Sequence, residues 1–191
     1  MPKFRDKLIT LPNPGLGTPS QKVGVVNQAI KDLVTEMEDT VLDWEASREH
    51  EVGVALAAIQ INRPLKVVVI RNNFDDKEDK TFTVLINPII TKYEGKIEDD
   101  YEGCLSVQDV YGKVPRHSKI RLKAKDLRGK EFRLNAEGFL ARVLQHEVDH
   151  TKGIMFVDHI IDDHEAFYKL TDKGNLEPLS EKDPMSHRIF R

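Results

Sequence analysis

The chain has 191 residues, of which 39% are hydrophobic and 32% charged, and its formal net charge is -3. This size and apolar content fit one domain, and the near-neutral charge gives no strong attraction to nucleic acid or to membrane surfaces. No apolar run approaches the roughly 20 residues of a membrane span, so we expect neither a membrane association nor direct nucleic-acid recognition. The start of the chain lacks the apolar region of a signal peptide, and the single cysteine, Cys104, allows no intramolecular disulfide. These features indicate a cytoplasmic protein.

The N-terminal half predicts a loop, a helix and then strands. Residues 11–20, rich in Pro and Gly, predict an irregular loop. From Val23 to about Ala46 apolar residues recur at spacings of three and four, which predicts a packing helix. The small apolar segment from Gly53 to Gln60 predicts a buried turn or short strand. Residues 65–70 and 81–86 predict two strands joined by an exposed hairpin tip over residues 72–80.

The C-terminal half predicts further short elements around one longer helix. Strands are expected at residues 89–93, 96–98, 119–125 and 131–134, with a turn over residues 126–129. Apolar residues at helical spacing then predict a helix over residues 136–150, with Asn135 as its N-cap and Gly153 as its stop. A short strand is expected at residues 154–157 and a short helix at residues 163–170, before a polar stretch from Thr171.

The helix expected over residues 136–150 carries the motif H-E-x-x-H at His146, Glu147 and His150. This spacing puts both imidazoles on one helical face, one turn apart, where they can share a divalent cation. Glu147 then lies near the cation without being a ligand, placed to take a proton from a water molecule. The alternative is a pair of core histidines satisfied by backbone carbonyls, and the bare motif leaves it open.

Cys104 stands in the run EGCLS, beside a glycine, where the lack of a side chain lets the backbone come close to a site. A cysteine thiolate is a strong ligand for zinc or ferrous iron. A buried free cysteine that acts as a small hydrophobe is the alternative reading. Cys104 is therefore a candidate third ligand for a cation held by the helix.

Three stretches together resemble the three motifs of peptide deformylases. EGCLS stands unchanged at residues 102–106 and QHExDH at residues 145–150, and the segment ending at Gln60 resembles GxGxAAxQ. The resemblance covers about residues 4–165. It predicts a compact α+β fold in which antiparallel β-sheets wrap around a central metal-binding helix, with an N-terminal packing helix.

The resemblance also makes residues 1–170 a single catalytic domain, followed by a polar C-terminal tail at residues 171–191. It implies removal of the formyl group from the formyl-methionine terminus of newly made polypeptides, with release of formate. Nascent formyl-Met polypeptides are then the substrates, and the ribosome is a further candidate partner. One divalent metal ion is implied, Fe2+ in the first place, with Zn2+, Ni2+ or Co2+ as alternatives.

The resemblance assigns roles to particular residues. Cys104, His146 and His150 are the implied metal ligands, with water in the fourth position, and Glu147 is the catalytic base. The side-chain amide of Gln60 and the backbone N–H of Leu105 are the implied donors to the oxyanion. The implied substrate-binding positions are Gly53, Val54, Ala55, Phe139 and Val143. Glu102 and Asp149 either orient ligands or form structural salt links.

The first motif departs from the family pattern at two positions. Ala55 stands where the family has its second glycine, and Ile59 stands where proline is common. If the backbone at Ala55 needs a positive φ, alanine is strained there, and Ile59 would restrain Gln60 less than proline does. We therefore expect a slower enzyme or one with altered substrate choice, in which Ala55→Gly raises the specificity constant at least a few-fold.

Two other functions fit the residues. A zinc peptidase of the H-E-x-x-H kind is one, although its extended motif would place a ligand at Phe156, which cannot bind metal; Glu165 or Glu177 would have to serve instead. The other is a deformylase-like binding protein with weak or lost turnover, which the altered first motif permits. Cleavage inside unformylated peptides would indicate the former, and metal binding without formate release the latter.

Overall fold

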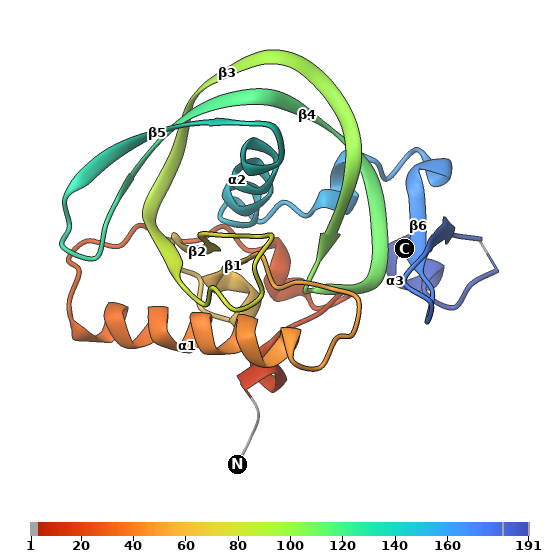
Figure 1. Cartoon of the computed structure of the whole chain (residues 1–191), viewed down its shortest axis with the longest axis horizontal. Coiled ribbons are helices and arrows are strands. Elements are labelled where there is room, and N and C mark those ends of the chain that lie inside the picture. The colour runs from red at the N-terminus through yellow and green to blue at the C-terminus, as the bar shows by residue number, and fades with distance from the viewer. Residues whose placement is uncertain (1–3, 181, 191) are drawn as a thin grey trace.

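A computed structural model describes residues 4–180 and 182–190 (Figure 1). Its strands form one open antiparallel sheet in the order β1-β2-β3-β4-β6-β7, and β5 pairs with β4 outside this path. The strands are β1 (Ala55–Ala57), β2 (Val67–Arg71), β3 (Phe82–Cys104), β4 (Val107–Lys125), β5 (Glu131–Glu137), β6 (Phe167–Leu170) and β7 (Leu176–Pro178). The α-helices of the described residues are α1 (Gln28–Glu45), α2 (Gly138–His150) and α3 (Ser186–Ile189). The predicted α+β class is confirmed, with one continuous sheet in place of separate ones.

Strands β3 and β4 form a long ribbon that arches over α2 (Figure 1). Their antiparallel pairing shifts register at four places, the last between Gly103 and Cys104. Such irregularities bend and twist a strand pair, which lets this ribbon curve around the helix. The separate strands predicted at residues 89–93 and 96–98 are therefore parts of β3.

Helix α1 runs along the side of the molecule that carries β1 and β2 (Figure 1). It begins after Asn27, whose side chain accepts a hydrogen bond from the backbone N–H of Ile30, so it starts five residues later than predicted. At its other end, Glu45 accepts hydrogen bonds from the buried guanidinium of Arg71 and from the backbone N–H of Gly53. These contacts fix the segment that leads into β1.

Helix α2 lies inside the arch, and its residues from Ala141 to His150 are all buried. The predicted N-cap, Asn135, instead lies in β5, which continues to Glu137 before the chain reverses. Gly138 makes the reversal with a φ of +57°, a backbone angle that favours glycine. After the helix, Gly153 has a φ of +76°, and a Cβ there would lie 2.4 Å from the carbonyl oxygen of Gly17. The predicted stop at Gly153 is confirmed.

Two predicted elements after α2 are wrong. The apolar run at residues 154–157 forms no strand; its buried side chains lead into a 3-10 turn at Phe156–His159. Residues 163–170 form no α-helix; a 3-10 turn at His164–Ala166 leads into β6, which pairs with β4. Apolar runs this short do not distinguish strand from helix, because the contacts that decide come from distant parts of the chain.

The described part of the predicted tail packs against the core. Strand β7 pairs with β6, and the backbone N–H of Leu179 donates to the carbonyl of Phe167 at 2.9 Å. Leu179 and Ile189 are buried in one cluster with Phe167. The division into a catalytic domain and a tail stays a prediction.

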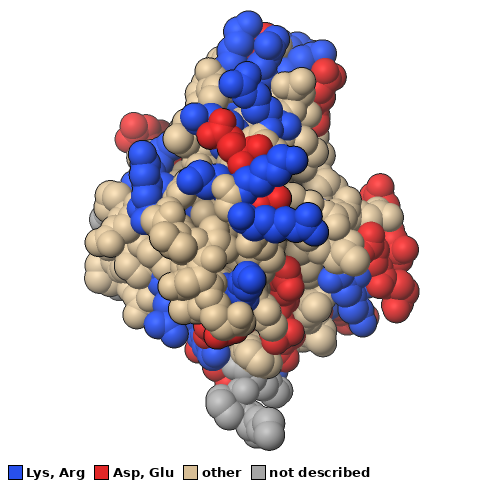
Figure 2. Space-filling view, turned by 90° about the vertical axis from the view of Figure 1, so that its left-hand side faces the viewer, with Lys and Arg blue, Asp and Glu red and all other residues tan. Residues whose placement is uncertain are grey.

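Charged side chains of both signs are interspersed on the face shown in Figure 2. This mixture agrees with the small net charge of the sequence, -3. Among residues 4–180 and 182–190, no helix has both the length and the apolar character needed to cross a bilayer.

Candidate active site

The three side chains expected to hold a metal meet where the end of β3 faces α2. The Sγ atom of Cys104 and one ring nitrogen each of His146 and His150 lie within 4.8 Å of one another. The two Nε2 atoms are 3.1 Å apart, and His150 Nε2 lies 3.4 Å from Cys104 Sγ. Both histidines are buried and Cys104 is half-buried. The i, i+4 spacing thus brings the imidazoles together as the motif predicts.

The chemistry of this cluster fits a divalent cation. One sulfur and two imidazole nitrogens suit zinc, iron and related metals. With metal–ligand bonds of about 2.0–2.3 Å, two ligand atoms of a tetrahedral site lie about 3.3–3.6 Å apart. The separations of His150 Nε2 from His146 Nε2 and from Cys104 Sγ, 3.1 and 3.4 Å, come close to that range. The cluster of the described residues includes neither Glu165 nor Glu177, the ligands that a peptidase would need.

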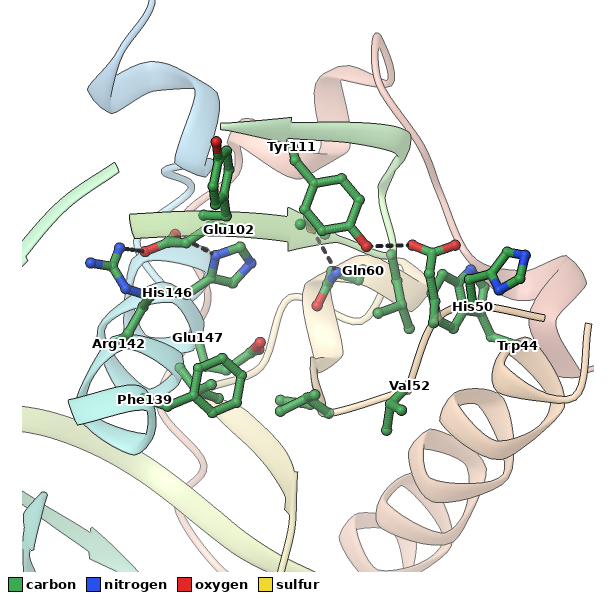
Figure 3. Close-up of a pocket in the computed structure, with 18 residues that line it drawn as sticks. Trp44, His50, Val52, Gln60, Glu102, Tyr111, Phe139, Arg142, His146 and Glu147 are labelled. Carbon is green, nitrogen blue, oxygen red and sulfur yellow. Dashed lines mark hydrogen bonds and ion pairs between the residues drawn. The ribbon is translucent and has the colours of Figure 1, made fainter. Parts of the chain in front are cut away.

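Glu147 points into the site from α2 but lies outside the ligand cluster (Figure 3). It is 4% exposed, and its Oε2 atom has no hydrogen-bond partner among the described residues. Burial raises the pKa of Glu147 to about 7. A carboxylate with such a pKa can both accept and return a proton near neutral pH.

Glu102 holds His146 from the side opposite the cation site. Its Oε2 lies 2.9 Å from His146 Nδ1, and its two oxygens also accept hydrogen bonds from Arg116 and Arg142. Burial alone would raise the pKa of Glu102, but the hydrogen bonds and charges of His146 and Arg116 outweigh it and lower the pKa to about 2. The carboxylate therefore stays ionised and accepts from Nδ1–H. In the neutral form of His146, this hydrogen bond leaves the Nε2 lone pair for a cation.

Asp149 does not contact the candidate ligands directly. It binds Arg116 and lies 2.9 Å from His159 Nε2 and 3.0 Å from Lys152 Nζ. Among the described residues, the side chain of Asp149 forms no hydrogen bond with His146 or His150. Of the two carboxylates expected around the ligands, Glu102 contacts the candidate ligand His146 directly, whereas Asp149 contacts Arg116, which binds Glu102.

Gln60 reaches the same site from the opposite wall. Its Oε1 accepts from the backbone N–H of Ala57 at 2.8 Å, and its Nε2 donates to Ser106 Oγ at 3.1 Å and lies 3.4 Å from Cys104 Sγ. The amide is therefore held at both ends beside Cys104. Ile59 is 2% exposed and packs in the core. Its packing helps to hold the segment that carries Gln60, and the expectation that isoleucine restrains Gln60 less than proline would stays a prediction.

The site opens into a cavity of about 290 Å³. Four of the five expected substrate-binding residues line it: Val54, Ala55, Phe139 and Val143, together with Gln60, Leu105 and Glu147. Gly53 does not line it, because it packs on α1, where a Cβ would lie 2.6 Å from a side-chain carbon of Val41. Gly53 therefore serves helix packing.

Ala55 lies in β1, paired with Ile70, and its backbone is not among the described residues with positive φ. The strain considered for alanine at this position is absent, because extended backbone accepts any L-residue. Only the size of the methyl group distinguishes Ala55 from glycine at the cavity wall.

Several residues that line the cavity were not predicted from the sequence. Trp44, His50, Glu51, Tyr101, Tyr111 and Arg142 all line it. In Figure 3, Trp44 and His50 lie on the side away from Phe139, and Arg142 lies beside Phe139. For Arg116 and Arg142 a signal exists: strand and helix periodicity place both among inward-facing positions, where a charge needs a partner. Tyr111 and Glu51 carry no such signal.

The comparisons with known proteins agree with this geometry. The sequence profile of the polypeptide deformylase family matches residues 5–166. Relatives named peptide deformylase include that of Aquifex aeolicus, 40% identical over 153 residues, with 80% of this chain and 86% of the relative covered. That of Stutzerimonas stutzeri is 39% identical, with 80% and 85% covered.

Solved structures give the same answer for the fold. A peptide deformylase from Synechococcus elongatus in complex with actinonin has a TM-score of 0.73 at 34% identity, with 80% of this chain and 78% of that chain covered. A peptide deformylase from Legionella pneumophila has a TM-score of 0.70 at 37% identity, with 80% and 83% covered. The chain belongs to the peptide deformylase family.

Proposed function

We propose that this chain removes the formyl group from the formyl-methionine terminus of newly made polypeptides and releases formate. The observation that carries the proposal is the convergence of Cys104, His146 and His150 beside the buried carboxylate of Glu147, in a chain of the deformylase family. The proposed ligands hold one divalent ion, Fe2+ in the first place. The proposed place of action is the cytoplasm, where such polypeptides are made.

The proposed metal supplies Lewis-acid chemistry, because it makes a nearby water more acidic and polarises the formyl carbonyl. Glu147 accepts the proton of the attacking water through its unpartnered Oε2 atom. The same carboxyl group then gives the proton to the leaving amine of methionine. A pKa of about 7 suits both transfers, since neither protonation state is strongly disfavoured near neutral pH.

Negative charge develops on the former carbonyl oxygen during the attack. The Nε2 group of Gln60 is the first proposed donor, because the hydrogen that it directs toward Cys104 Sγ, 3.4 Å away, lies next to the reacting centre and would turn to the oxyanion. The backbone N–H of Leu105, the residue after Cys104, is the second proposed donor. The loss of one such donor typically lowers the rate about 100- to 1,000-fold.

The methionine side chain is proposed to lie against Val54, Phe139 and Val143 in the cavity. Phe139 is 52% exposed and lines the cavity, and sulfur–aromatic contacts favour methionine beside such a ring. Ala55 borders the same space from β1.

A formate-release assay on formyl-Met peptides tests the proposal, with an unformylated Met peptide assayed beside it. We expect formate and intact deformylated peptide as the products. Metal binding without formate release would support a binding protein instead. Cleavage at internal peptide bonds would support a peptidase.

A further inference from the structure

A hydrogen bond joins the two walls of the cavity on the side away from Phe139 (Figure 3). The hydroxyl of Tyr111, in β4, donates to Glu51 Oε1 at 2.8 Å (Figure 3). One wall, where β3 ends and β4 begins, carries Cys104 and Leu105. The other is the segment that leads from α1 into β1 and on to Gln60. The Tyr111–Glu51 bond therefore joins the two sides of the cavity that would have to hold a substrate between them.

The ring of Tyr111 rests on the backbone beside the metal ligand Cys104. Tyr111 faces Gly103 across the β3–β4 ladder, and a Cβ on Gly103 would lie 2.6 Å from a ring carbon of Tyr111. That distance is too short for any residue other than glycine at this position. The ring thus lies along Gly103 at one edge and is bound to Glu51 through its hydroxyl.

The acceptor of this bond is also held in place. Arg48 Nη1 lies 3.6 Å from Glu51 Oε2 and 2.6 Å from Asp109 Oδ1. The guanidinium of Arg48 in turn lies over the ring of Trp44, 5.2 Å from its centroid. The side chain of Glu51 is only 11% exposed. Glu51 therefore offers the Tyr111 hydroxyl a fixed oxygen and not a mobile surface carboxylate.

An open groove adjoins the cavity at this bond. His50 and Glu51 line both the cavity and the groove, which runs on along residues 47–49 and 170–172. We take the residues that follow a first side chain at Phe139 to lie at the Tyr111–Glu51 end, because this end adjoins the open groove. We propose that the Tyr111–Glu51 hydrogen bond sets the width of the cavity at this exit and positions the second to fourth residues of the peptide substrate. The inference rests on the proposed function, and it makes Tyr111 and Glu51 positioning residues.

The test compares formyl-Met-Ala with formyl-Met-Ala-Ala-Ala in wild type and in Tyr111→Phe, which keeps the ring and removes the hydroxyl. A hydrogen bond of ordinary strength predicts a fall in the specificity constant of about 3- to 10-fold for the longer peptide. We expect less than half of that fall for the shorter one, mostly through KM in both cases. Tyr93→Phe is the matched control, because Tyr93 is an exposed tyrosine on β3 away from the cavity, and it should leave the ratio of the two constants unaltered.

Variants of Glu51 show whether the two residues act through one bond. Glu51→Gln keeps an acceptor oxygen and should retain most of the preference for the longer peptide, whereas Glu51→Ala should lose it. Tyr111→Phe should then have no further effect in the Glu51→Ala background. Additive losses, or equal falls for both peptide lengths, would overturn the proposal.

Formate release by the wild type from formyl-Met-Ala tests the proposed function separately. If no formate appears, fluorescence anisotropy with labelled Met-Ala and Met-Ala-Ala-Ala still tests the positioning role. The proposal then requires that Tyr111→Phe weakens binding of the longer peptide more than that of the shorter one. Equal weakening of both would reject it.

Discussion

His146 Nδ1 lies 2.9 Å from Glu102 Oε2, and the histidine presents its other ring nitrogen to Cys104 and His150. The carboxylate fixes both the tautomer and the orientation of the ring, so it prepares His146 to act as a ligand. Glu102 is held in turn by Arg116 and Arg142. If His146 is a metal ligand, as proposed, Glu102 should determine metal affinity although it does not belong to the ligand cluster.

Glu102→Gln should therefore weaken metal binding about 10- to 100-fold, the range typical of residues that orient a ligand. The loss follows from a weaker hold on His146 Nδ1 and lower basicity of Nε2. Competition with a chromophoric chelator measures the affinity. Glu98→Gln, at an exposed pair with Lys96 on the same strand, is the control and should bind metal as the wild type does. Equal affinities for Glu102→Gln and wild type would remove this role.

Glu102 should also make the metal-free protein sensitive to acid. Its folded pKa, about 2, lies below the ordinary value of 4.5. The stabilisation is therefore present above the unfolded pKa and is lost as the pH falls from about 5 toward 2. The difference corresponds to about 3 kcal/mol of unfolding free energy. Urea unfolding at pH 7, 5 and 3 should show this loss in the wild type, and Glu102→Gln should show a smaller dependence on pH.

Glu147→Gln keeps the size of the side chain and removes its ability to take a proton. Metal content should stay at one ion per chain, since Glu147 is outside the ligand cluster. Turnover should fall about 100- to 10,000-fold, as expected when a general base is lost. Glu137→Gln, exposed just before α2, controls for the change of carboxylate to amide. Turnover within a few-fold of wild type in Glu147→Gln would show that another group moves the proton.

Ala55→Gly should not accelerate the enzyme, in contrast to the expectation from the family motif alone. Ala55 lies in β1 with ordinary backbone angles, so glycine relieves no strain there. Glycine within a strand instead lowers the unfolding free energy by about 0.5–1 kcal/mol. Urea unfolding and the specificity constant for a formyl-Met peptide check both parts. A rise of several-fold in the specificity constant would show that the methyl group obstructs the substrate.

The sequence predicted those parts of the site that lie within short stretches. The spacing of His146 and His150 is a local property of a helix, and the periodicity around them was enough to place both in the core. The family motifs then supplied Cys104 and Gln60. The cap of α2 was missed because β5 runs directly into the helix, and nothing near Asn135 signals this pairing.

Contacts between segments that are distant in the chain could not be predicted from the sequence. Tyr111 and Glu51 are 60 residues apart and meet only because the β3–β4 ribbon curves back to the segment before β1. Arg116 binds Glu102 across the same ribbon. The apolar run at residues 154–157 forms a 3-10 turn because its buried side chains join a cluster with residues from β4 and the C-terminal segment.

The most direct test of the account is a metal titration of the metal-free protein under anaerobic conditions, with formate release from a formyl-Met peptide as the readout. Activity should rise linearly with added Fe2+ and stop rising at one ion per chain, because Cys104, His146 and His150 form one site. Cys104→Ala should neither bind the ion stoichiometrically nor gain activity. Formate release that is independent of metal, or full metal occupancy in Cys104→Ala, would contradict the account.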